Sequence, residues 1–119
     1  MYEIPGDVDW SFLIGKELLQ VCYGKYQTQL WFEGNVNISI EGNIEHRDGA
    51  TVLGRTLERE QTLMSLVALL GASIAGVSCE GRRVLVFALS NGHAVALFSD
   101  DSPYEAFSIS APGEQTLIV

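Results

Sequence analysis

The chain has few basic residues, few prolines and only two cysteines. Seven Lys and Arg against fifteen Asp and Glu give a formal net charge of −8, which repels nucleic acids and anionic membranes and favours a cationic partner. The 3 prolines and the 47% hydrophobic fraction exclude disorder, because enough apolar surface exists to offset the entropy of ordering the chain. No apolar run approaches the roughly 20 residues that span a bilayer. These absences predict a folded acidic protein that binds neither nucleic acid nor membrane.

The first twenty residues also lack the features of a signal peptide. They have no basic n-region and no small-residue cleavage site, and they carry Asp7 and Asp9 instead. We therefore expect a cytoplasmic protein in which Cys22 and Cys79 remain reduced thiols. A chain of 119 residues fits a single domain, which we place over residues 1–119.

The two halves of the chain echo each other. Leu13-Ile14-Gly15 followed by Val21 reappears 56 positions later as Leu69-Leu70-Gly71 followed by Val77. Each copy continues into apolar stretches that a glycine interrupts. The spacing predicts a pseudo-repeat of two related β-meanders with a small loop insertion between them.

The first meander is expected over residues 12–41, with strands at about 17–23, 25–32 and 36–41. Apolar and polar residues alternate strictly over 36–41, which is typical of a strand with one buried face. Glu33-Gly34-Asn35 supplies glycine and asparagine where a tight hairpin needs positive φ.

Between residues 42 and 55 the apolar periodicity stops, and we expect a loop or a short extra hairpin that turns at Asp48-Gly49. One helix follows at about 57–70, where Thr56 can cap the start. Its apolar stripe is expected at Leu63, Leu66, Val67 and Leu70.

The second meander is expected over about 73–110, with strand-like runs at 74–79, 83–89, 94–98 and 104–109. Asn91-Gly92 is the strongest hairpin signal in the chain. The sequence thus predicts an α+β fold, in which two mostly antiparallel β-meanders are joined by one amphipathic helix packed on the sheet.

The sequence gives little support for catalysis. His46 and His93 lie far apart without the spacing of a metal motif, and we expect both to be exposed in loops or turns. Glu41, Glu45 and Asp48 crowd around His46, but a solvated acidic loop explains this cluster without an ion. The cysteines lack a CxxC context and the serines lack a nucleophile elbow. We expect no enzyme, no metal and no cofactor.

Two features favour a protein partner. Asp100, Asp101, Tyr104 and Glu105 form an acidic and aromatic rim that suits an Arg or Lys of a partner, although such residues also occur in ordinary solvated turns. Trp31 falls on the polar side of its strand, so it is either an exposed contact or covered by a second layer.

The chain resembles a family of small uncharacterised bacterial proteins, a domain of unknown function, over most of its length. The resemblance is carried by Leu13-Ile14-Gly15-Lys16, Tyr26-Gln27-Thr28-Gln29-Leu30, Ile38-Ser39-Ile40-Glu41-Gly42, Phe87 to Gly92, and Tyr104-Glu105-Ala106-Phe107 with Ile109. It is more loosely similar to small acidic immunity proteins that neutralise bacterial toxins. Neither resemblance implies catalytic residues.

Three kinds of function are therefore expected. The first is a non-catalytic protein-binding module, most concretely an immunity-type inhibitor of a basic bacterial toxin. The alternatives are a homo-oligomeric scaffold protein, such as a homodimer, and a small-ligand-binding domain with a cavity between the meanders.

Overall fold

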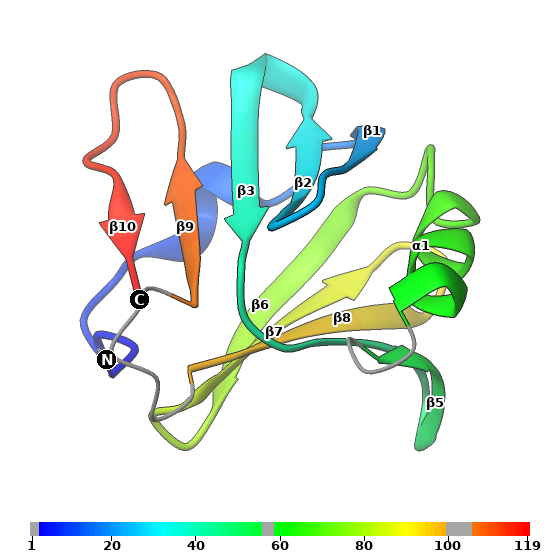
Figure 1. Ribbon diagram of the computed structural model, residues 1–119. Helices are drawn as coiled ribbons and strands as arrows, with labels where there is room; N and C mark the ends of the chain where they lie inside the picture. Colours follow the sequence, from blue (N-terminus) through cyan, green and yellow to red (C-terminus); the bar gives the residue numbers. More distant parts are fainter. Residues whose placement is uncertain (1–2, 56–58, 100–105) are drawn as a thin grey trace.

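The computed structural model describes residues 3–55, 59–99 and 106–119. Strands dominate this part of the chain, and the one α-helix is short (Figure 1). The elements are η1 (Trp10–Leu13), β1 (Leu18–Tyr23), β2 (Thr28–Phe32), η2 (Glu33–Asn35), β3 (Val36–Ile40), β4 (Ile44–Asp48), β5 (Thr51–Arg55), α1 (Arg59–Val67), β6 (Ile74–Glu80), β7 (Val84–Leu89), β8 (His93–Phe98), β9 (Phe107–Ser110) and β10 (Leu117–Ile118). Among the described residues, no helix has both the length and the apolar character needed to cross a membrane.

The strands form two five-stranded sheets, in the orders β1-β2-β3-β9-β10 and β5-β4-β8-β7-β6. Every pairing between these strands is antiparallel. Figure 1 shows the two sheets as layers whose strands run across each other, with the helix beside one end of both. This arrangement is mostly antiparallel β with one helix, as the broad fold prediction required.

Each meander keeps its own three strands, but the hairpin that follows it crosses to the other meander. The hairpin β4–β5 follows β3 in the chain and pairs with β8, whereas β9–β10 follows β8 and pairs with β3. The prediction of one continuous second meander over 73–110 was therefore wrong in its last strand, which belongs to the first sheet. Alternation alone carries no information about which neighbour a strand chooses.

The segment 42–55 forms the hairpin alternative rather than a loop. Strands β4 and β5 pair directly, and Gly49 takes a φ of 60° at the turn that joins them. The earlier turn is also as expected, since Gly34 and Asn35 both have positive φ, at 73° and 59°.

The two halves are related by a pseudo-twofold arrangement of hydrogen bonds. The Gly15 N–H donates to the Ile74 carbonyl, and the Gly71 N–H donates to the Leu18 carbonyl. Each bond becomes the other when the 56-position offset is applied. Glu17 and Ser73, which are equivalent by the same offset, form an isolated bridge between the halves. The predicted pseudo-repeat thus corresponds to matched contacts in the structure.

Irregularities in the strands repeat as well. Strand β1 has a bulge between Leu18 and Gln20, and β6 has one between Ile74 and Gly76. A bulge shifts the alternation of side chains between the two faces of the sheet, and here it does so at equivalent positions of the two strands. The matched bulges extend the equivalence from the loops into the sheets.

The helix packs differently from the prediction. Leu66 and Leu69 are buried at 1% exposure, whereas Val67 and Leu70 are 46% and 45% exposed. The expected stripe was wrong at these two positions because the buried residues are Thr62, Leu66 and Leu69, a helical spacing that leaves Val67 and Leu70 on the open side. The proposed capping residue Thr56 lies outside the described residues.

Candidate functional site

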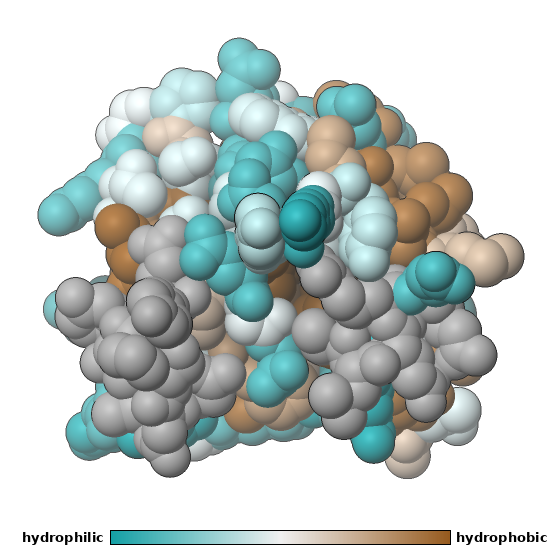
Figure 2. All heavy atoms as spheres, in the orientation of Figure 1, coloured by the Kyte–Doolittle hydropathy of each residue, from teal (hydrophilic) through white to brown (hydrophobic). Residues whose placement is uncertain are grey.

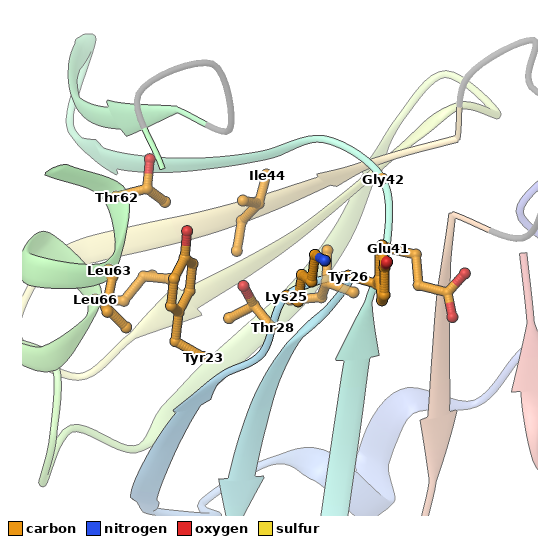
Figure 3. A pocket seen from close by; sticks show the side chains of 11 residues that line it. Tyr23, Lys25, Tyr26, Thr28, Glu41, Gly42, Ile44, Thr62, Leu63 and Leu66 are labelled. Atoms are coloured by element: carbon orange, nitrogen blue, oxygen red, sulfur yellow. The ribbon is translucent and has the colours of Figure 1, made fainter. Parts of the chain in front are cut away.

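A pocket of about 210 Å³ opens between the two sheets, next to the helix α1. It is framed by the β1–β2 hairpin, by the linker between β3 and β4, and by α1 (Figure 3). Its lining residues are Tyr23, Lys25, Tyr26, Thr28, Ile40, Glu41, Gly42, Ile44, Thr62, Leu63 and Leu66. None of these lining residues belongs to the second meander, so this pocket differs from the cavity between the two meanders that the small-ligand alternative requires.

The pocket is apolar inside and polar at its mouth. Figure 3 shows the ring of Tyr23 beside Leu63 and Leu66, while Lys25 and Tyr26 lie on the side of Glu41. The Lys25 ammonium nitrogen lies 5.4 Å from the centre of the Tyr26 ring, a cation–π distance. Such a combination can hold an apolar group and orient a charged one next to it.

Exposed apolar side chains gather on the elements that frame this pocket. Most of the large hydrophobic side chains exposed by the described residues lie on β1, on the β1–β2 turn, on α1 and on the turn after it. We call this the helix–hairpin face, and it comprises Leu19, Tyr23, Tyr26, Met64, Val67 and Leu70. Met64 and Tyr26 are the most open, at 76% and 77% exposure. Figure 2 shows hydrophobic side chains gathered over β1 and α1 at the upper right.

A second candidate site is a pair of imidazoles. His46 is 1% exposed in β4, and its Nε2 lies 2.8 Å from Nδ1 of His93. The prediction that both histidines are exposed loop residues was wrong: His46 is core and His93 is half-buried. The alternation of Ile44 with His46 carried the signal, because residues two apart in a strand share one face.

The hydrogen bonds of this pair indicate a tautomer. His46 Nδ1 is buried and has no hydrogen-bond partner among the described residues. A buried N–H without a partner costs more free energy than a buried unprotonated nitrogen without one. His46 is therefore expected to carry its proton on Nε2 and to donate it to Nδ1 of His93. His93 then carries its proton on Nε2, which lies 3.8 Å from a carboxylate oxygen of Asp48.

Burial lowers the pKa of His46 below its ordinary value of 6.5. The charge of His93 lowers this pKa further, and the carboxylate of Asp48 raises it in part. A buried neutral imidazole resists protonation because the charged form would lose its hydration. His46 is therefore held in its neutral form in the folded protein.

Several carboxylates are already paired within the protein. Arg47 contacts Glu45 and Glu80 at 3.0 Å each, and Arg55 contacts Glu45 at 3.3 Å. The hydrogen bond to Glu80 is the main cause that raises the pKa of Arg47. These acidic groups across the second sheet are therefore satisfied internally and contribute less to partner attraction than their number suggests.

The residues that the sequence proposed for partner binding fall in two places. Trp31 is half-buried on the outer face of the first sheet, where its indole N–H donates to Gln29 at 3.2 Å. The rim of Asp100, Asp101, Tyr104 and Glu105 lies outside the described residues. The structure therefore does not bring Trp31 to the pocket, and the rim stays a prediction from the sequence.

Within residues 3–55, 59–99 and 106–119, no group of three or more His, Cys, Asp or Glu side chains is arranged to hold a metal ion. Comparisons of the chain with family models, curated proteins and solved structures find no match.

Proposed function

We propose that the protein is a non-catalytic protein-binding module and that it binds its partner through the helix–hairpin face. The observation that carries the proposal is the gathering of exposed Leu, Met, Val and Tyr side chains on the helix and the hairpin that frame a pocket, in an otherwise acidic chain. Tyrosine and methionine are enriched in the buried centres of interfaces, and apolar patches with polar surroundings mark interaction sites.

The partner is expected to be basic. A net charge of −8 creates a long-range field that attracts cations and accelerates their association. The apolar face would then supply most of the affinity, since a few well-packed side chains dominate the binding free energy of most interfaces.

In its most concrete form the module is an immunity-type inhibitor, and the basic partner is a bacterial toxin whose active site it occludes. The acidity of the chain and its resemblance to immunity proteins support this form. A one-to-one complex that abolishes the toxin's activity would be its biochemical signature.

The test is capture of the partner with the tagged protein, followed by titration of the purified partner by calorimetry at two salt concentrations. Val67→Asp should weaken binding by about 100-fold, because it places a charge in the apolar face. Leu53→Asp is the matched control, since Leu53 is similarly exposed, at 41%, on β5. Equal losses in both variants would contradict the proposed face, and a chain that captures only its own copies would favour the homodimer scaffold.

The pocket itself favours a second candidate, a small-ligand-binding domain. Its volume of about 210 Å³ lies below the roughly 300–1,000 Å³ of typical ligand sites, so any such ligand would be small. Thermal-shift measurements with amino acids and short carboxylic acids test this candidate, which fails if none of them raises the melting temperature.

A further inference from the structure

The pocket has a counterpart in the second half of the molecule. Tyr23 pairs with Thr28 at the end of the β1–β2 hairpin, and Cys79 pairs with Leu85 at the same place in the β6–β7 hairpin. Arg82 therefore lies at the tip of its turn as Lys25 does in the first half. The two hairpin tips can be compared directly.

In the second half, the N-terminal segment of the chain occupies this place. The backbone N–H of Ile4 donates to the carbonyl of Arg82 at 2.9 Å, and the side chain of Ile4 is buried at 3% exposure. The preceding residue adds an ion pair, since the Glu3 carboxylate lies 3.3 Å from the Arg82 guanidinium. An acidic residue followed by isoleucine thus binds at the hairpin tip.

The helix α1 packs beside the β1–β2 hairpin, in the place that the N-terminal segment takes beside the β6–β7 hairpin. The turn bonds from Ile14 to Ser11 and from Leu70 to Val67 keep the 56-position offset, which aligns residues 4–10 with 60–66. A helix advances about 1.5 Å per residue, whereas an extended chain advances about 3.3 Å. The helix therefore spans less distance than the segment does, and the pocket opens at the β1–β2 tip.

The side chains at the β1–β2 tip are also smaller than their equivalents at the β6–β7 tip. Thr28 is half-buried where the second half has the fully buried Leu85. Ile44 pairs with Leu97 as Phe107 pairs with Ile40, so an isoleucine stands where the second half has a larger aromatic ring. The first half is consequently short of apolar volume at the position that Ile4 helps to fill in the second.

We infer that the pocket binds a short extended segment of the partner protein, which inserts one branched apolar side chain between Tyr23, Thr28 and Leu63. An acidic residue immediately before it pairs with Lys25, as Glu3 pairs with Arg82. The pocket volume suits one side chain better than a free ligand. Strand β1 is the edge strand of the first sheet, and extended peptides commonly bind at sheet edges through backbone hydrogen bonds. This inference rests on the proposed protein-binding function.

The probe is a capped peptide with the sequence of residues 2–6, acetyl-Tyr-Glu-Ile-Pro-Gly-amide, titrated into isotope-labelled protein. NMR shifts should concentrate at Tyr23, Thr28 and Leu63 and should saturate at millimolar peptide. A peptide with serine in place of isoleucine should bind at least about tenfold more weakly, because the buried hydrocarbon is lost. Shifts confined to the Arg82 turn, equal binding of both peptides, or no shifts at about 10 mM would overturn the inference.

A variant of the protein makes the test independent of peptide solubility. Thr28→Leu copies Leu85 and fills the pocket, so it should weaken peptide binding by at least about tenfold. Thr51→Leu, on an exposed position of β5, should leave binding unchanged and controls for the added bulk. Peptide binding that survives Thr28→Leu also overturns the inference.

The two proposals fail separately. If the captured partner binds Thr28→Leu as well as the natural protein, while Val67→Asp abolishes binding, the pocket inference fails and the proposed function stands. If Val67→Asp has no effect on partner binding, the proposed face fails even where the peptide occupies the pocket.

Discussion

His46 faces Val95 across the β4–β8 pair as Ile109 faces Ile38 across the β9–β3 pair. A buried imidazole thus stands where the other half of the molecule has a hydrocarbon side chain. Because Nδ1 of His46 has no partner among the described residues, the imidazole costs stability that isoleucine would not.

We expect His46→Ile to stabilise the protein by about 1 kcal/mol at pH 7.5, because it removes an unsatisfied buried nitrogen at a site whose equivalent accepts isoleucine. Urea unfolding measures this difference as a higher midpoint at unchanged slope. A destabilised His46→Ile variant would show that the contact between the two imidazoles is worth more than the buried nitrogen costs.

The stability of the natural protein should fall as the pH drops below about 6.5. His46 has a lowered pKa in the folded protein, so the unfolded chain binds a proton there before the folded chain does. Protons therefore favour unfolding from the unfolded value of 6.5 down to the folded pKa. Unfolding curves between pH 7.5 and 5.5 should show this slope in the natural protein, and His46→Ile should lose it while keeping the titration of the carboxylates.

Some of this arrangement was predictable from sequence and some was not. Strands β1 to β3 and β6 to β8 and the turn at Gly34 were predicted, because alternation and turn residues are local signals. The exchange of the β4–β5 and β9–β10 hairpins was missed, since strand choice depends on contacts between residues far apart in the chain. The burial of His46 was not predicted, because imidazole is polar and the alternation of β4 extends over only five residues. The pocket was not predicted, because it depends on how the helix packs beside the β1–β2 hairpin.

Leu66→Ala should destabilise the protein by about 2–5 kcal/mol, since Leu66 is 1% exposed and its loss leaves a cavity under the helix. Leu70→Ala is the matched comparison on the following turn. Leu70 is 45% exposed, so its truncation should cost less than about 1 kcal/mol. Thermal and urea unfolding of both variants check the difference, and equal losses would mean that both residues lie in the core.

The acidic rim gives a prediction about association kinetics. Asp100→Lys combined with Glu105→Lys should slow the association of a basic partner and reduce its dependence on salt, because charges at the edge of an interface act mainly by steering. Stopped-flow association at two ionic strengths measures both effects. A partner whose association rate ignores the double variant would assign the steering to other carboxylates of the chain.

Gly54 on β5 lies close against the helix α1. A Cβ built on Gly54 would lie 2.6 Å from Ser65 Oγ and 2.9 Å from Thr62 Cα, and the second contact involves backbone that a rotamer change cannot move. Gly54→Ala should therefore push α1 outward and destabilise the protein by about 1–3 kcal/mol. Gly76→Ala in β6 is the control, since its Cβ would meet nothing within 4 Å.

Because α1 also forms one wall of the pocket, Gly54→Ala should perturb the NMR shifts of Leu63 and Tyr23, whereas Gly76→Ala should not. Unchanged stability and shifts in Gly54→Ala would mean that the helix packs on this sheet more loosely than the structure indicates.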